Sequence, residues 1–274
     1  MKSFTDHYRL HTEGGRQYLT FPQLDEYKEL RHLFTTRHGG VSEGCVGTWN
    51  FGARSLDTPE NIRRNYEILA DTLCLPADRL VASDQTHTVN IREVTAADGG
   101  KGVTRPKDYR DVDGLVTKER GLALVTGHAD CNAIFFFDPA EQVIGLAHSD
   151  WRGTLGGIGR EMVRLMESRY GCRPADILAG IGPSLCQECF EVDADVAQAF
   201  FDADSAYRQF ALQRGAKHHI DLKGIIRHDL LACGLGETHL FDMGLCTKCD
   251  TANFFSHRGQ KGKRGIMAAA MALI

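Results

Sequence analysis

Three residues that are far apart in the sequence carry side chains able to share one metal ion. His87, Cys131 and His148 lie 44 and then 17 positions apart, each at the end of a predicted apolar strand. Imidazole nitrogen and thiolate sulfur suit a borderline-soft divalent cation, and three protein ligands leave a fourth tetrahedral position for water or substrate. The sequence therefore predicts a catalytic zinc site, with copper as the alternative metal.

An inert role for these residues has to be weighed against metal binding. A cysteine beside a buried strand is usually a small apolar residue, and a lone histidine usually has its hydrogen bonds satisfied by neighbours. Charged neighbours favour the functional interpretation, because Asp130 precedes Cys131 while Asp150 and Arg152 follow His148. Burying such charges at strand ends without a function would be costly.

Two C-x-x-C pairs form a second candidate metal site. They consist of Cys186 with Cys189 and Cys246 with Cys249, and 56 residues lie between the pairs. Compact zinc ribbons usually span roughly 15 to 20 residues between their pairs. The spacing therefore favours separate core or loop thiols over a structural metal site.

Short apolar strands have to position the ligands. The segments 121–126, 133–137 and 143–147 are rich in β-branched and aromatic residues, as is typical of strands buried on both faces. We expect them to form the centre of one sheet. Two further strands are predicted, one over 33–36 before the Gly39-Gly40 turn and one over 177–181.

Capping residues predict the helices between and after these strands. Thr58 and Pro59 begin a predicted helix over 59–73. Thr154 is expected to cap a helix that ends near residue 171, and two more helices are expected after Asp193 and Asp221. The predicted fold class is α/β, or α+β, with a single domain over 1–274 whose mixed central sheet is flanked by helices.

Composition limits the partners and the compartment. A net charge of −4 gives no electrostatic reason to expect nucleic acid, and the short basic cluster from Arg258 to Arg264 is interpreted as a glycine-rich loop. No segment approaches the ~20 apolar residues of a membrane span, and the first residues lack the apolar core of a secretion signal. Nine cysteines, an odd number, suit reduced thiols. We expect a cytoplasmic monomer with neither membrane nor nucleic-acid partners.

Ordered motifs along most of the chain resemble the YfiH/YlmD family, called laccase-domain or polyphenol-oxidase-like proteins and now regarded as purine nucleoside phosphorylases. Ser149-Asp150 departs from the family's common Ala-Gly, and His257 replaces a more usual aromatic residue. These departures concern the expected substrate side rather than the metal ligands. The motifs lie at residues 36–42, 50, 85–87, 113–117, 129–131, 148–153, 182–183, 189–192, 246–249 and 254–258.

The resemblance implies a YfiH-like fold and roles for particular residues. It implies zinc bound by the ligands named above, with Arg37, Cys131 and His148 as catalytic residues. It implies that Arg37, with Arg258 as the alternative, contacts phosphate through a forked guanidinium. The remaining residues expected to bind substrate are Ser42, Asn50, Gln85 and Asp113, although Asp113 could equally cap a turn.

The implied reaction is attack of phosphate on the ribose C1′ of adenosine, inosine or guanosine, and also of methylthioadenosine, with adenosine deamination as a second activity. One alternative is a copper-dependent polyphenol oxidase, which is disfavoured because multicopper sites need many histidines and no His-x-His pair occurs here. Another is a cysteine-dependent amide hydrolase that edits peptidoglycan precursors, with Cys131 as nucleophile and His148 as base. A non-enzymatic metal-binding module would need a fourth protein ligand, which the sequence does not show.

Overall fold

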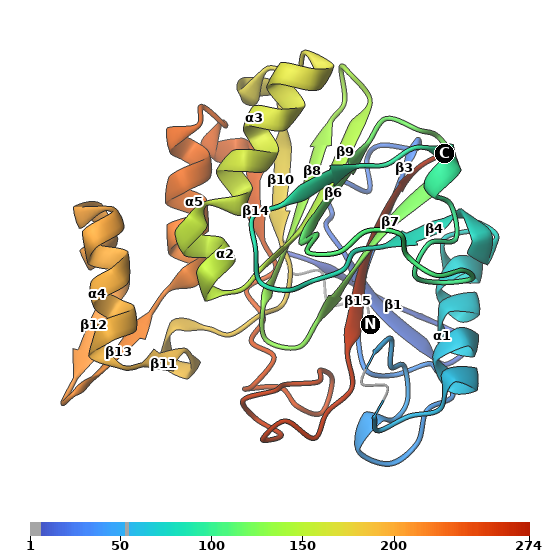
Figure 1. Ribbon diagram of the computed structural model, residues 1–274, viewed down its shortest axis with the longest axis horizontal. Helices are drawn as coiled ribbons and strands as arrows, with labels where there is room; N and C mark the ends of the chain where they lie inside the picture. The colour runs from blue at the N-terminus through green and yellow to red at the C-terminus, as the bar shows by residue number, and fades with distance from the viewer. Residues whose placement is uncertain (1–6, 53–54) are drawn as a thin grey trace.

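Two six-stranded sheets that pack face to face form the centre of the molecule (Figure 1). The computed structural model describes residues 7–52 and 55–274. Residues 1–6, on which the expected absence of a secretion signal rests, lie outside the described residues. In order, the strands of the first sheet are β1 (Arg9–Glu13), β2 (Arg16–Thr20), β3 (Leu30–Thr35), β15 (Met267–Leu273), β7 (Leu122–His128) and β4 (Leu80–Ala82).

Both sheets are mixed. In the first sheet only β4 and β7 run parallel, whereas in the second the two outer pairs do. The order in the second sheet is β14 (Leu240–Asp242), β10 (Leu178–Ile181), β8 (Asn132–Asp138), β9 (Val143–Ser149), β6 (Gly114–Thr117) and β5 (Ile91–Glu93). A small third sheet contains β11 (Glu191–Val192), β13 (Lys217–Ile220) and β12 (Ala211–Arg214).

Strand β8 shows how the core is divided. Its seven residues are all buried, as the unbroken apolar run predicts. Phe135 and Phe137 face the first sheet, whereas Ile134 and Phe136 face the helices on the other side. Successive side chains of a strand point to opposite faces, so this one segment contributes to both apolar layers.

Helices cover the outer face of each large sheet. The first sheet is covered by α1 (Pro59–Thr72), and the second by α3 (Ile158–Tyr170) and α5 (Leu222–Ala232). The helix α2 (Trp151–Gly156) precedes α3, and α4 (Ala194–Ala203) lies with the small sheet at one side of the molecule (Figure 1). In the described parts of the chain, no helix is both long enough and apolar enough to span a bilayer.

The predicted fold class is confirmed, but the expected arrangement of the central strands is wrong. β8 and β9 pair with each other, whereas β7 pairs with β15 and β4 in the other sheet. An unbroken apolar run indicates that a strand is buried on both faces. The run looks the same whether helices or a second sheet cover the strand, so it does not show to which sheet the strand belongs. The pairing of β7 with β15 cannot be predicted from the local hydrophobic pattern of either segment.

The expected cap at Thr154 is also wrong. Asp150 begins α2, because its Oδ1 accepts a hydrogen bond from the backbone N–H of Gly153 at 2.7 Å. Gly157 then adopts a left-handed conformation with φ of 77°, and α3 begins directly after it. Asp221 caps α5 as expected, whereas Asp193 precedes α4 without a capping hydrogen bond from its side chain. A glycine that accepts positive φ thus divides the expected helix in two.

His32 makes the stability of the first sheet depend on pH. Its ring is buried against Phe21 and Phe135, and its Nε2 accepts a hydrogen bond from the backbone N–H of Phe21 at 2.8 Å. Burial lowers the pKa of His32 to about 4, and the carboxylate of Asp25 offsets this only in part. The folded protein therefore keeps His32 neutral at pH values where an exposed histidine is protonated.

We expect the free energy of unfolding to fall as pH drops from about 6.5 to about 4, because the unfolded chain then binds a proton that the folded chain excludes. The full loss from this residue is on the order of 3 kcal/mol. His32→Gln keeps an acceptor for Phe21 but does not titrate, so its urea midpoint should change less over this range. The exposed His7→Gln serves as the control, and equal pH slopes for His32→Gln and wild type would contradict the assignment.

Candidate metal centre

The three predicted ligands converge where the chain passes from the first large sheet to the second. His87 lies in the loop after β4, Cys131 in the connection from β7 to β8, and His148 near the end of β9. One ligand atom from each side chain lies within 4.8 Å of the other two. The β7–β8 connection passes from one sheet to the other, which brings residues that are distant in sequence to a common point.

Strand register explains why Asp113 lies beside His148. Gly114 pairs with Ala147 across β6 and β9, and the backbone N–H of His148 donates to the carbonyl of Asp113 at 2.8 Å. The Oδ1 of Asp113 also accepts a hydrogen bond from Nδ1 of His148 at 2.8 Å. This bond fixes the plane of the imidazole and leaves Nε2 available as a metal ligand.

The same carboxylate also holds the loop that carries His87. Asp113 is fully buried and accepts hydrogen bonds from the backbone N–H groups of Thr86, His87 and Thr88 at 3.1, 3.2 and 2.8 Å. Burial raises the pKa of Asp113, but the hydrogen bonds from His148 and Thr88 outweigh it and lower the pKa to about 2. One ionised carboxylate therefore positions both histidines.

His87 is held in an uncommon backbone conformation. Its φ is +69°, in the left-handed region that residues other than glycine rarely adopt. Its side chain is 51% exposed, and its ring stacks on that of His148 with centroids 5.5 Å apart. The bonds to Asp113 retain this conformation, which directs the imidazole toward the other two ligands.

The thiol of Cys131 lies among groups of both charges. Burial raises the pKa of Cys131, the carboxylates of Asp150 and Asp130 raise it further, and the guanidinium of Arg264 opposes them. A thiolate is therefore disfavoured at this position unless additional positive charge lies close to it.

A pocket opens around these side chains, and we call it the metal-site pocket. Its volume is about 300 Å³. Its lining combines apolar and charged side chains, which suits a ligand that has an aromatic part and an anionic part. The metal-site pocket is lined by His87, Ala129, Asp130, Cys131, Asp150, Trp151, Arg152, Leu185, Phe190, Leu222, His257, Arg258 and Arg264.

Arg264 is a residue of this pocket that the sequence analysis missed. Its guanidinium is half-buried, and its Nε has no hydrogen-bond partner among the described residues. Burial lowers the pKa of Arg264, against the attraction of Asp130 and Cys131. The basic cluster in the sequence was the available signal, but its glycines and lysines favoured interpretation as a surface loop.

Arg37 does not line the metal-site pocket. Its Nε donates to the carbonyl of Gly47 at 3.1 Å, and its Nη1 donates to the carbonyl of Thr251 at 2.9 Å. The guanidinium also lies over the ring of Phe255, 4.7 Å from the centroid. Its donors therefore tie two loops together.

The other predicted substrate-binding residues divide between the metal-site pocket and the structural interior. Arg258 lines the pocket, whereas Ser42 and Asn50 are buried and both bond to Asp57. Gln85 donates to the carbonyl of Gly127 and accepts from its N–H, each at 2.7 Å. The side chains of these three residues bond within the structure and do not line the metal-site pocket, while Asp113 positions two of the predicted ligands.

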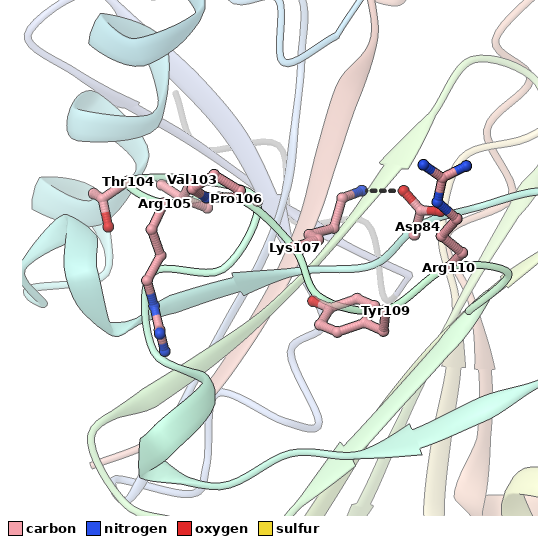
Figure 2. Close-up of a pocket in the computed structure, with 9 residues that line it drawn as sticks. Asp84, Val103, Thr104, Arg105, Pro106, Lys107, Tyr109 and Arg110 are labelled. Atoms are coloured by element: carbon pink, nitrogen blue, oxygen red, sulfur yellow. Dashed lines mark ion pairs between the residues drawn. The ribbon is translucent and has the colours of Figure 1, made fainter.

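A larger hollow of about 580 Å³ lies elsewhere, lined by residues 102–107 with Asp84, Tyr109 and Arg110 (Figure 2). There Lys107 points toward Asp84, with Nζ 2.5 Å from Oδ1. None of the residues predicted to form the site lines this hollow. The chemistry of the side chains, rather than size, identifies the metal-site pocket as the candidate.

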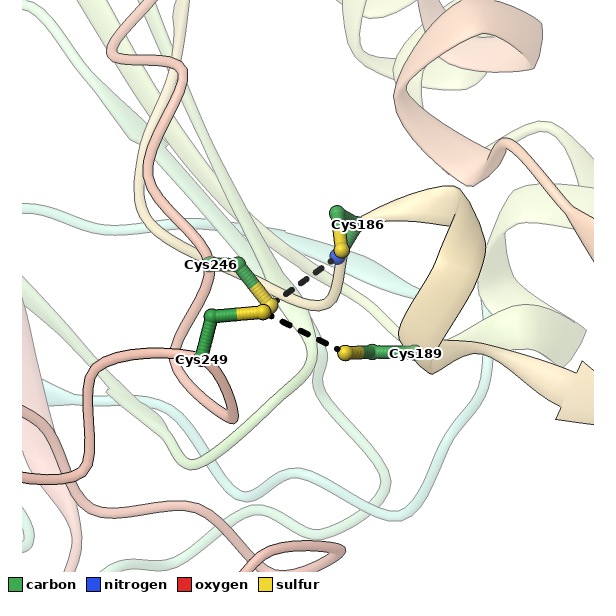
Figure 3. Close-up of side chains that lie close together, drawn as sticks. All are labelled: Cys186, Cys189, Cys246 and Cys249. Atoms are coloured by element: carbon green, nitrogen blue, oxygen red, sulfur yellow. Dashed lines mark hydrogen bonds between the residues drawn. The ribbon is translucent and has the colours of Figure 1, made fainter.

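The four cysteines expected to be unrelated thiols are brought together, so that expectation is wrong. The sulfur atoms of Cys186, Cys189, Cys246 and Cys249 all lie within 4.8 Å of one another (Figure 3). Parallel pairing of β10 with β14 aligns the segments that follow these strands, and a bridge joins Ser184 to Cys246. The intervening residues form α4, the small sheet and α5, so sequence distance did not measure spatial distance.

Comparisons with known proteins cover most of the chain. The family model described as multi-copper polyphenol oxidoreductase laccase matches residues 31–274. The purine nucleoside phosphorylase YlmD of Bacillus subtilis is 36% identical over 254 residues, covering 90% of this chain and 89% of the relative. A purine nucleoside phosphorylase of Deinococcus radiodurans is 37% identical over 263 residues, covering 96% and 95%.

Solved structures show the same fold. The hypothetical protein YfiH of Bacillus licheniformis superposes with a TM-score of 0.91 at 31% identity, covering 97% of this chain and 99% of that one. YlmD from Geobacillus stearothermophilus superposes with a TM-score of 0.87 at 32% identity, covering 98% and 99%.

Proposed function

Because the chain belongs to the multi-copper polyphenol oxidoreductase laccase family, which includes YfiH and YlmD, we propose that it is a metal-dependent purine nucleoside phosphorylase. Relatives that bear this name match about nine-tenths of the chain or more. The observation that carries the proposal is the convergence of His87, Cys131 and His148 beside an arginine with an unpartnered donor. Adenosine, inosine, guanosine and methylthioadenosine are the proposed substrates.

The donor set suits zinc. Two imidazoles and one thiol, with His148 held by a buried carboxylate, match the ligands and the supporting hydrogen bonds of catalytic zinc sites. When bound, the ion would supply a Lewis acid that polarises a substrate oxygen. His87, Cys131 and His148 would hold it, and the pocket side of the ion would stay open to substrate.

Arg264 is the group that we propose for binding phosphate. Arg264 lines the pocket, its buried Nε has no partner among the described residues, and a guanidinium presents a fork of donors that matches phosphate oxygens. Arg258 lines the same pocket, but its Nη1 already donates to the carbonyl of Glu191 at 3.0 Å. Arg37 remains the prediction from the family resemblance, although its Nε and Nη1 both bond to backbone carbonyls.

Apolar side chains of the pocket lining suit a purine. Phe190, Leu185 and Leu222 are buried residues of this lining, and the side chain of Trp151 packs against the same apolar cluster. We propose that the base packs on these side chains while phosphate lies near Arg264. That placement would hold the anion and the ribose C1′ together, so that attack becomes effectively unimolecular.

Product analysis tests the proposal. Metal-analysed protein is incubated with inosine or adenosine, with and without phosphate, and the products are separated by chromatography. We expect ribose 1-phosphate and free base only when phosphate is present, and inosine from adenosine if the chain is also a deaminase. Absence of any purine product from wild type and Cys131→Ala alike would overturn the assignment.

The same preparations test the two alternative functions. A copper oxidase would oxidise phenols and contain copper, yet the two ligand clusters found in residues 7–52 and 55–274 contain only two histidines between them. A cysteine hydrolase would keep its activity after treatment with a chelator, whereas a zinc enzyme would lose it. Metal analysis and chelation therefore separate all three reactions.

Asp113→Asn should weaken binding of metal at the catalytic site by about 10- to 100-fold. The amide keeps the size of the carboxylate but removes the charge that orients Nδ1 of His148. Competition with a chromophoric zinc chelator measures the affinity, and the exposed Asp71→Asn is the control. An unchanged affinity in Asp113→Asn would show that the carboxylate only holds the backbone of residues 86–88.

A further inference from the structure

Four cysteines that the proposed reaction does not use form a second cluster, which we call the cysteine cluster (Cys186, Cys189, Cys246 and Cys249). Cys189 ends the short 3-10 helix η5 (Gln187–Cys189), which Cys186 precedes, and the other two lie in the turn after β14. Their sulfur atoms converge (Figure 3), with those of Cys189 and Cys249 3.5 Å apart. All four are free thiols.

We propose that the cysteine cluster binds a structural Zn²⁺ ion, distinct from the metal at His87, Cys131 and His148. A tetrahedron with Zn–S bonds of about 2.3 Å has sulfur–sulfur edges of about 3.8 Å. The spacing here, with every pair of sulfurs within 4.8 Å, accommodates an ion at the centre after small side-chain adjustments. Four thiolates also close the coordination sphere, as structural zinc sites require.

Backbone geometry supports this assignment. The N–H of Cys186 points at the sulfur of Cys246, with the nitrogen 3.4 Å away. Hydrogen bonds of this kind stabilise negative charge on a ligating sulfur. The two C-x-x-C segments thus approach each other through a backbone donor as well as through their thiols.

Other uses of four clustered thiols fit less well. A disulfide needs a sulfur–sulfur distance of about 2.05 Å, well below the separation of Cys189 and Cys249. A polynuclear iron–sulfur cluster places irons and sulfides between its ligands, so it needs the four sulfurs further apart than they are here. A single tetrahedral ion is therefore the best fit for the cysteine cluster.

The location gives the ion a structural purpose. Beside Cys186, the N–H of Leu185 donates to the carbonyl of Asp130 at 3.1 Å. Beside Cys246, the Oγ1 of Thr247 donates to Oδ1 of the same aspartate at 2.7 Å. Zinc in the cysteine cluster would hold together two segments that both contact the residue preceding Cys131. The inference does not depend on the reaction that we propose for the pocket.

Metal counting on the purified full chain tests this inference. We expect two zinc ions per wild-type chain, and one in either Cys249→Ser or Cys189→Ser. Cys131→Ala should also hold one, and the double variant Cys131→Ala with Cys249→Ser none. The exposed Cys74→Ser is the matched control and should keep both ions.

A conservative variant guards against loss of folding. Cys249 is exposed, so Cys249→His can offer an imidazole ligand in place of the thiolate and should retain two zinc ions. Cobalt-loaded Cys131→Ala should show the intense thiolate-to-metal charge-transfer absorption of a four-sulfur site. An unchanged zinc count in both serine variants would overturn the inference. So would iron in place of zinc, or two disulfides detected by alkylation of the unreduced protein.

Discussion

Cys131→Ala is expected to lower the rate of phosphate-dependent cleavage of inosine by at least ~10³-fold, because it removes a ligand from a cation expected to supply several kcal/mol of transition-state stabilisation. Cys131 is the only anionic donor among the three clustered ligands. The two ligands that remain are imidazoles, and among the described residues no carboxylate belongs to this cluster. The readout is kcat/KM for inosine at saturating phosphate, measured together with the zinc content.

The control and the second readout distinguish this loss from misfolding. Cys74→Ala changes an exposed cysteine at the end of α1 and should retain wild-type activity. Cys131→Ala should keep the wild-type far-ultraviolet circular dichroism and lose one zinc ion. If its activity disappeared while its metal content stayed unchanged, Cys131 would be a nucleophile rather than a ligand.

The clustering of the three predicted ligands could be anticipated because each follows or ends an apolar strand. Histidine and cysteine at such positions are few, and the adjacent aspartates marked them as polar ends of buried segments. Sequence could not reveal the role of Asp113, because its partner at position 148 becomes its neighbour only through the register of β6 and β9. A turn residue and a residue that orients an imidazole look alike until the strands pair.

The positions of Arg37 and Arg264, by contrast, could not be predicted from their neighbours in the sequence. Arg37 follows a strand and precedes two glycines, which predicts a binding loop, yet its guanidinium contacts the carbonyls of Gly47 and Thr251. Arg264 lies among lysines and glycines, but the chain that leads into β15 carries it to Cys131. Which arginine reaches the pocket depends on the position of β15 between β3 and β7 in the first sheet. The sequence around each arginine does not predict this position.

Arg264→Ala is expected to lower phosphate-dependent turnover by about 10²- to 10³-fold, the usual cost of removing one donor to an anion in a reacting site. The KM for phosphate should rise, because phosphate would lose the guanidinium that we propose as its binding group. Phosphate-independent conversion of adenosine to inosine, where it occurs, should change much less. The turnover of Arg264→Lys should lie between those of wild type and Arg264→Ala, since lysine keeps the positive charge but not the forked pair of donors.

Arg37→Ala is the comparison that separates the two guanidinium groups. Its donors join the loops that carry Gly47 and Thr251, so its loss should lower the free energy of unfolding by up to about 1 to 3 kcal/mol, the cost of leaving a carbonyl without its partner. The KM for phosphate should stay within about threefold of wild type, because Arg37 does not line the metal-site pocket. Urea denaturation and phosphate titration measure the two effects. If instead Arg37→Ala raised the KM for phosphate and Arg264→Ala left it unchanged, phosphate binding would belong to Arg37. The unpartnered Nε of Arg264 would then need another ligand.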